Sequence, residues 1–135
     1  MIKTIASAFL LASTLSAQAS VLNCRDNVDV RQEVLRPRYT VKVTELENIT
    51  NKVPYGRNYD SVLRVRVDLK VTLGSRLLEN RAFEAIARTE DVMYNVSAVR
   101  EQGFKFWTYL DELDQSGIEL TDRSGRKTEV QLTCF

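Results

Sequence analysis

Within residues 60–73, side chains alternate between apolar and polar from Leu63 to Leu73, and this pattern constrains the fold more than any other feature of the chain. The segment has the sequence DSVLRVRVDLKVTL. Because successive side chains of a β-strand point to opposite faces, its apolar residues form a buried face and its charged residues a solvated one. A strand of about 12 residues is roughly 40 Å long, so in a small domain it must coil or bend.

Comparable alternation recurs along most of the chain. It covers residues 28–34, 39–44, 92–98, 104–110 and the two arms of a hairpin around 122–125. Seven or eight strands with short connections predict a single-domain, mainly β fold, either an antiparallel β-sandwich or a small β-barrel. Residues 76–88 also fit one short helix, because they are rich in Leu, Ala, Glu and Arg at helical spacing. We favour a strand there, since the surrounding segments are all β.

The first 19 residues have the composition of a secretory signal peptide. A positive start is followed by a short apolar run and by small residues, with Ala17 and Ala19 forming an A-x-A cleavage pair before Ser20. The apolar run is too short to anchor a protein in a bilayer, and no later segment approaches about 18 consecutive apolar residues. We therefore expect a cleaved signal over residues 1–19 and one exported domain over residues 20–135, periplasmic or secreted and without a membrane span.

Two sequons bear on the source of the chain. Asn48 and Asn95 each begin an Asn-x-Ser/Thr sequence, which a eukaryotic secretory pathway would glycosylate. A glycan at Asn95 would project from the middle of a predicted strand, an awkward position. The sequence therefore favours a bacterial origin.

The two cysteines, Cys24 and Cys134, lie near opposite ends of the predicted domain. In an oxidising compartment this placement predicts one disulfide that ties the two ends together. Cys134 shares the inward phase of Val130 and Leu132, so the first and last strands are expected to be neighbours. The alternative is a lipoprotein acylated at Cys24, but the preceding Asn23 is not small and Cys134 would then be left unpaired.

Several chemistries are excluded or disfavoured by composition. The chain has no histidine, which excludes Ser-His-Asp and Cys-His nucleophile systems and histidine-ligated zinc. Its five glycines form no phosphate-binding loop, and its 19 Lys and Arg residues nearly balance 18 Asp and Glu residues, so no nucleic-acid partner is expected. We expect no cofactor, and any catalysis would depend on carboxylate, lysine or tyrosine side chains.

The densest group of carboxylates lies in residues 109–119, YLDELDQSGIE. Clustered oxygen ligands can hold Ca²⁺, which makes Asp111 and Asp114 weak calcium candidates. The spacing matches no EF-hand, and Asp-Gln-Ser-Gly fits a turn between strands equally well. We favour a solvated loop without metal.

The long irregular connection at residues 48–60 carries the candidate contact residues Tyr55, Arg57 and Tyr59. Tyrosine and arginine are favoured in recognition surfaces because each combines a large contact area with a hydrogen-bonding tip. Long loops on rigid scaffolds often carry function. The alternative is that one tyrosine attaches the loop to the sheet while the other side chains are merely exposed.

The charged row of residues 60–73 is interpreted as scaffold. Its members, Arg64, Arg66, Asp68 and Lys70, have mixed sign. Such charges normally face complementary charges across a β-ladder. The chain has acidic residues that could face this row, for example Asp29 and Glu33, or Glu119 and Glu129.

These observations favour a small exported, non-enzymatic β-scaffold that binds or interacts with a partner. It would act as an inhibitor, adaptor or ligand carrier toward a protein, glycan or small ligand outside the cytoplasm. The alternative is a structural cell-envelope component that assembles by strand addition, for which an exposed strand edge is needed. A carboxylate-dependent hydrolase ranks third.

Overall fold

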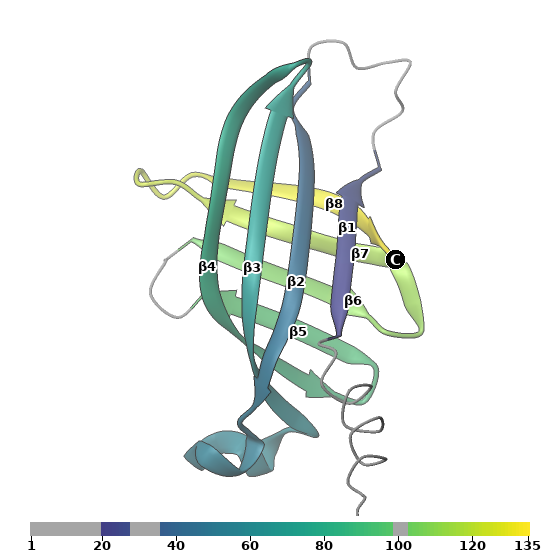
Figure 1. The fold of residues 1–135 in the computed structure, drawn as a ribbon, viewed down its shortest axis with the longest axis vertical. Coiled ribbons are helices and arrows are strands. Elements are labelled where there is room, and N and C mark those ends of the chain that lie inside the picture. The colour runs from purple at the N-terminus through teal and green to yellow at the C-terminus, as the bar shows by residue number, and fades with distance from the viewer. Residues whose placement is uncertain (1–19, 28–35, 99–102) are drawn as a thin grey trace, which may run out of the picture.

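A computed structural model describes residues 20–27, 36–98 and 103–135, which form one closed barrel of antiparallel strands in sequence order (Figure 1). The strands are β1 (Val21–Asp26), β2 (Arg38–Asn48), β3 (Ser61–Leu73), β4 (Arg76–Glu90), β5 (Met93–Ala98), β6 (Phe104–Tyr109), β7 (Glu112–Thr121) and β8 (Lys127–Cys134). Each strand pairs with the next one along the chain, and β8 pairs with β1 to close the barrel. The small-barrel prediction is confirmed. The predicted signal peptide at 1–19 and the alternating run at 28–34 fall outside the described residues.

The segment that could have been helix or strand is a strand. β4 has 15 residues and pairs with the 13-residue β3. Its Ala85 and Ala87 are fully buried opposite Val65 and Leu63, in phase with the core. Tertiary pairing thus overrides the helix propensity of the Leu-, Ala-, Glu- and Arg-rich sequence.

The solvated loop predicted for residues 109–119 was wrong. Only Leu110 and Asp111 form a turn there, and β7 begins at Glu112. Ser116 points into the barrel, where its hydroxyl lies 2.6 Å from the Thr108 hydroxyl and donates to the Leu113 carbonyl oxygen at 2.7 Å. A satisfied hydroxyl can be buried at little cost, so a polar sequence continues as a strand.

The charged row of β3 lies on the outer face and finds its partners on adjacent strands. Arg64 contacts Glu47 of β2 at 3.3 Å and Glu84 of β4 at 3.0 Å. The predicted pairing with Glu119 and Glu129 was wrong, because those two residues lie opposite each other on β7 and β8. The other suggested pair falls outside the described residues.

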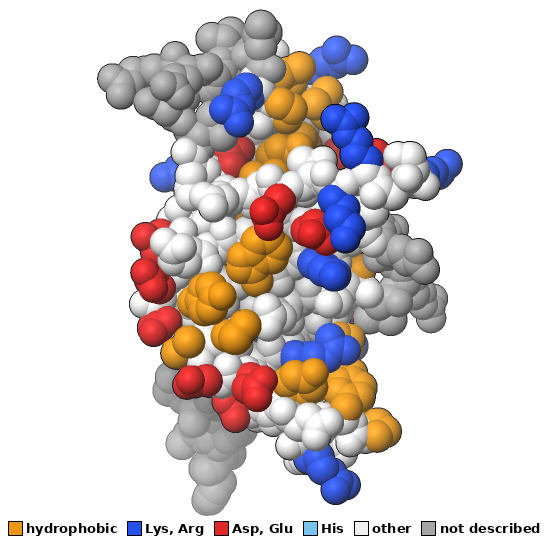
Figure 2. All heavy atoms as spheres, turned by 180° about the vertical axis from the view of Figure 1, so that it is seen from behind, with side chains coloured by type: hydrophobic (Ala, Val, Ile, Leu, Met, Phe, Trp, Pro, Cys, Tyr) orange, Lys and Arg blue, Asp and Glu red, His pale blue; other side chains and the backbone are white. Residues whose placement is uncertain are grey.

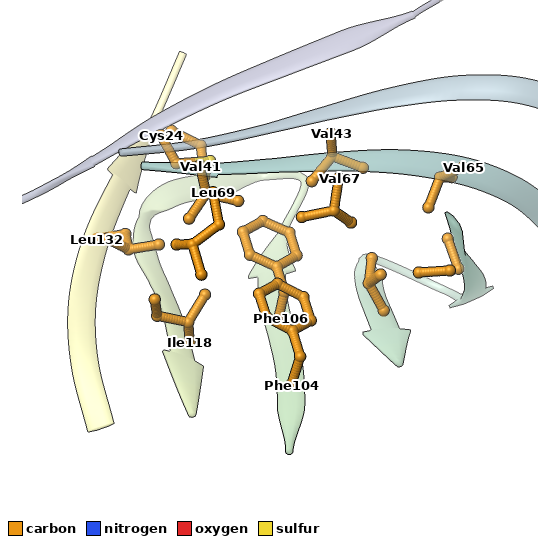
Figure 3. Packing of buried hydrophobic residues seen from close by; sticks show 14 of the residues in the cluster. Cys24, Val41, Val43, Val65, Val67, Leu69, Phe104, Phe106, Ile118 and Leu132 are labelled. Atoms are coloured by element: carbon orange, nitrogen blue, oxygen red, sulfur yellow. A yellow bond between two sulfur atoms is a disulfide. The ribbon is translucent and has the colours of Figure 1, made fainter. Parts of the chain in front are cut away.

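The barrel interior is filled by apolar side chains that converge from opposite walls (Figure 3). Valines and leucines of β2 and β3 meet the aromatic and aliphatic residues of β6, β7 and β8. Phe83 and Phe104 add an edge-to-face contact with ring centroids 5.0 Å apart. The labelled core residues are Cys24, Val41, Val43, Val65, Val67, Leu69, Phe104, Phe106, Ile118 and Leu132.

The predicted disulfide is confirmed. Cys24 and Cys134 are directly opposite each other on β1 and β8, and both are 3% exposed. The bond lies where the first and last strands meet, so it fastens the closure of the barrel. The thiol that a lipid anchor would need at Cys24 is used in this bond.

Strand lengths differ around the barrel. β2, β3 and β4 run along the long axis of the molecule, and β5 to β8 cross behind them (Figure 1). Among the residues that the structure describes, β4 pairs with β5 through residues 85–90 alone. The β3–β4 hairpin therefore extends beyond β5 at the upper end of Figure 1.

Candidate functional site

Residues 48–60 join β2 to β3 and fold into two short 3-10 helices, η2 (Thr50–Lys52) and η3 (Pro54–Asn58). They form the lower end of the molecule in Figure 1. We call this segment the η loop. It contains all three predicted contact residues.

The start of the η loop is fastened to β3. The Asn48 side-chain oxygen accepts hydrogen bonds from the Thr50 backbone N–H at 3.0 Å and from its hydroxyl at 2.6 Å. The Val62 N–H in turn donates to the Thr50 hydroxyl at 2.9 Å, and the Ile49 N–H donates to the Val62 carbonyl oxygen at 2.8 Å. These bonds cap the loop and continue the strand pairing into it.

The two 3-10 helices are packed backbone against backbone. A Cβ atom added to Gly56 would lie 1.9 Å from the Thr50 carbonyl oxygen, so only glycine fits without a shift of the backbone. Gly56 is buried between the half-buried Tyr55 and the exposed Arg57. The η loop is therefore a compact unit.

Tyr55 and Tyr59 pack around one arginine of the barrel wall. Their rings meet edge to face with centroids 6.4 Å apart. The guanidinium carbon of Arg88 lies 5.1 Å from the Tyr55 centroid and 5.9 Å from that of Tyr59, within cation–π range. Arg88 is opposite Val62, which is fully buried although it alternates out of phase with the core. The η loop thus covers the outer face of β3 and β4 around Val62 and Arg88.

The three predicted contact residues are placed differently. Tyr55 and Tyr59 are half-buried against Arg88, whereas Arg57 is exposed, as are Pro54 and Asn58 beside it. Arg88 is the member that sequence reasoning missed. No local signal marks it, because its position depends on the β3–β4 register.

Charges next to the η loop form a short network. Glu47 contacts Lys52 at 2.5 Å and Arg64 at 3.3 Å. The hydrogen bond from Lys52, followed by that from Arg64, holds the pKa of Glu47 below its usual value. Lys52 is therefore paired with Glu47, although its side chain is also exposed, and Arg57 is a second exposed cation of the η loop.

The weak calcium candidates lie apart from this loop. Asp111 is exposed in the β6–β7 turn and Asp114 is exposed on β7. Within residues 20–27, 36–98 and 103–135, no group of three or more Asp, Glu or Cys side chains is placed to hold a metal ion.

A surface pocket of about 380 Å³ lies at the β7–β8 turn. Its charged lining includes Lys105, Glu119, Asp122, Arg123 and Lys127. Hydrogen bonds from Ser124 and the Arg126 N–H keep the pKa of Asp122 low, because this carboxylate caps the turn. The mixed charge gives the pocket no clear preference for an anion.

Asp26 is a buried carboxylate near the upper end of the barrel. Its side chain is 1% exposed and contacts Arg38 at 2.9 Å and the Tyr39 N–H at 2.5 Å. Burial, reinforced by the charges of Glu79 and Asp26, raises the pKa of Tyr39. The contacts connect the end of β1 to the start of β2, which fits a structural role.

Tyr94 and Glu45 form a polar pair inside the barrel. Tyr94 is 3% exposed, and its hydroxyl donates to a Glu45 carboxylate oxygen at 3.3 Å. Burial is the main cause that raises the pKa of Tyr94, and the negative charge of Glu45 adds to it.

This pair makes stability sensitive to alkaline pH. Above the ordinary tyrosine pKa of about 10, the unfolded chain loses the phenolic proton while the folded protein keeps it. Unfolding then releases a proton, so rising pH should lower the free energy of unfolding by up to about 1.4 kcal/mol per pH unit. Urea denaturation between neutral and strongly alkaline pH should show a shallower loss for Tyr94→Phe than for the unmodified protein. Equal slopes would contradict the buried, protonated assignment.

Among the described ranges, no helix is long and apolar enough to cross a membrane. Comparisons of the chain with protein-family models, with curated proteins and with solved structures found no match. Any function assigned to the chain therefore rests on its own geometry.

Proposed function

We propose that the chain is an exported, non-enzymatic binding module that contacts its partner through the tip of the η loop. The observation that carries this proposal is the construction of the loop. The Gly56–Thr50 packing and the Arg88–tyrosine contacts hold it in one shape, while Arg57 is exposed at its tip. A loop already ordered before binding loses less conformational entropy when a partner docks.

The filled interior supports surface binding over carriage of a ligand inside the barrel. Eight-stranded barrels either fill with side chains or hold one small ligand. Here Leu69, Phe106 and Ile118, each 1% exposed or less, converge on the centre. An inhibitor or adaptor role toward a protein or glycan therefore fits better than a ligand-carrier role.

Arg57 suggests the chemistry of the contact. A guanidinium group favours carboxylates, to which it can donate two parallel hydrogen bonds. The outer edges of Tyr55 and Tyr59 would add apolar contact next to it. We therefore expect a partner that presents an acidic group outside the cytoplasm.

The first experiment is site-specific photo-crosslinking in cells that naturally export the protein. A photoreactive residue at Asn58, beside Arg57, should form a discrete adduct, and Arg57→Ala in the same chain should reduce its yield. The same probe at Ser124, in the exposed β7–β8 turn, is the matched control. An adduct that forms equally at both positions, or that does not depend on Arg57, would refute the proposal.

Substitutions at Arg57 and at Tyr55 should differ in their effects on binding affinity and on stability. Arg57→Ala should weaken binding of the cross-linked partner roughly thirtyfold, the loss expected at a binding hot spot of about 2 kcal/mol. Its free energy of unfolding should change by no more than about 0.5 kcal/mol, as is usual for an exposed residue. Tyr55→Ala should lower stability by about 1–2 kcal/mol, because it removes the contact with Arg88. Titration calorimetry and urea denaturation measure the two effects, with Arg123→Ala as the exposed-arginine control.

A second candidate function is assembly by strand addition. It requires an unpaired strand edge. Residues 76–84 of β4 pair with β3 on one side, and no strand of the described chain pairs with them on the other. This edge gives the alternative a specific structural basis.

A further inference from the structure

Within the described residues, the upper half of β4 presents a long open edge. Residues 76–84 follow β3 along its final half, beyond the point where the pairing with β5 ends. In Figure 1 this part of β4 is the outer margin of the long three-stranded face. Alternate backbone N–H and C=O groups along such an edge point away from the sheet and can pair with another strand.

The sequence of this edge is complementary to itself when reversed. Residues 76–84 are RLLENRAFE, with positive and negative charges placed antisymmetrically about Asn80. If a second copy runs antiparallel with Asn80 opposite Asn80, Glu79 faces the partner's Arg81 and Arg81 faces the partner's Glu79. In the same alignment Leu78 comes opposite the partner's Ala82, and Arg76 comes near the partner's Glu84.

We propose that two copies of this chain associate through these β4 edges, in antiparallel register centred on Asn80, to form one continuous sheet across a two-fold axis. A two-fold axis requires a self-complementary surface, and the antisymmetric charge order provides one. The proposal is independent of the function assigned to the η loop, which lies at the other end of the barrel.

The positions of Glu79 and Arg81 support this register. They are cross-strand partners of Val71 and Leu69, so both lie on the inner side of the extended hairpin. Within one chain they already form an ion pair. Pairing of two copies would place four charges of alternating sign in a square on that face, and opposite charges directly across a β-ladder are stabilising.

A β-bulge limits the match to the centre of the edge. The β3–β4 register shifts between the partners Glu79 and Leu77, so Leu78 is the extra residue. The pairs formed by residues 79, 80 and 81 are unaffected by the bulge. The outer pairs shift by up to one residue, a distance that a long arginine side chain can span.

Exposed apolar side chains lie near this edge, with Leu77 and Ala82 on the outer face of the sheet, opposite to the inner face that carries Glu79 and Arg81. Leu77 and Leu78 are 52% and 44% exposed, and Leu46 is 44% exposed at a shallow surface pocket shared with Ala82. Viewed from behind, apolar side chains gather at the end of the molecule from which the hairpin extends (Figure 2). A second copy paired along the edge would lie beside Leu77 and Leu78, whereas Leu46 on β2 is separated from the edge by β3.

The order of charges along residues 76–84 favours pairing with a second copy rather than preventing it. Edges protected against pairing typically carry charges such as lysine that repel a second copy. Here the reversed sequence places unlike charges opposite each other. Because a two-strand contact buries less surface than a standard interface, we expect a reversible dimer that forms with increasing concentration.

The test is sedimentation equilibrium of the processed protein from low micromolar to hundreds of micromolar concentration. The unmodified protein should shift from monomer to dimer. Arg81→Glu and Glu79→Arg should each reduce the association constant about tenfold or more, since each places like charges opposite one another twice per dimer. An equimolar mixture of the two single variants should dimerise again, because unlike charges then face each other at both positions.

The double variant Glu79→Arg/Arg81→Glu should also dimerise, and Arg57→Glu, in the η loop at the opposite end of the molecule, should behave like the unmodified protein. Circular dichroism and thermal denaturation verify that each variant folds. Rescue in the mixture cannot arise from the ion pair within one chain, so it reports the register between copies. A monomer at every concentration, or a dimer that the single swaps do not weaken, would overturn the proposal.

Discussion

Replacing Cys24 and Cys134 together by alanine should lower the free energy of unfolding by about 4–5 kcal/mol. The disulfide joins residues 110 positions apart, and a bridge over so long a loop removes much of the conformational entropy of the unfolded chain. Its position adds to the effect, because the described β1–β8 pairing is short: three register pairs and the two backbone hydrogen bonds between Asn23 and Phe135. Urea denaturation of the oxidised protein and of the double variant measures the difference.

The matched control is the unmodified protein denatured under reducing conditions. Reduction should lower stability by nearly the same amount as the double alanine variant, since both remove the cross-link. A loss below about 1 kcal/mol in both experiments would show that strand pairing alone closes the barrel.

Phe106→Ala should lower the free energy of unfolding by about 3–5 kcal/mol, the usual cost of truncating a buried phenylalanine. Phe106 is 1% exposed and lies at the centre of the packed interior (Figure 3). The neighbouring Lys105 points outward on the same strand, so Lys105→Ala should change stability by no more than about 0.5 kcal/mol. Chemical denaturation of the two variants gives the comparison.

The size of the Phe106 effect also bears on function. A loss below about 1 kcal/mol would mean that the interior repacks easily or is not tightly filled. In that case carriage of a small ligand inside the barrel would regain support over surface binding.

Much of the barrel could be predicted because alternation of side chains is a local property. The period of two in residues 60–73 indicated β3, and the inward phase of Cys134 indicated its pairing with Cys24. β7 was missed because Asp114, Gln115 and Ser116 resemble a turn. A strand with one solvated face tolerates such residues, and the buried Ser116 finds its hydrogen-bond partners only once β6 lies beside it.

The candidate site was less predictable, because its geometry depends on contacts between distant segments. The sequence identified Tyr55, Arg57 and Tyr59 as contact residues. It could not show that the two tyrosines would pack against Arg88 while Arg57 stays exposed. Likewise, nothing local indicates that β5 pairs with only the second half of β4. Both facts follow from strand register, which is fixed by the whole barrel rather than by any one segment.

The closure between β1 and β8 also governs the order in which the barrel can form. Each of the other seven ladders joins two strands that are consecutive in sequence, so these contacts can form as hairpins before the whole chain is present. The pairing between β1 and β8 can form only when β8, the last of these eight strands in sequence order, is present. Until then the nascent chain has open ends at both its first and its latest strand, where misassembly with other chains begins. We therefore expect the final, slow step of folding to be the meeting of the two ends and the oxidation that joins them.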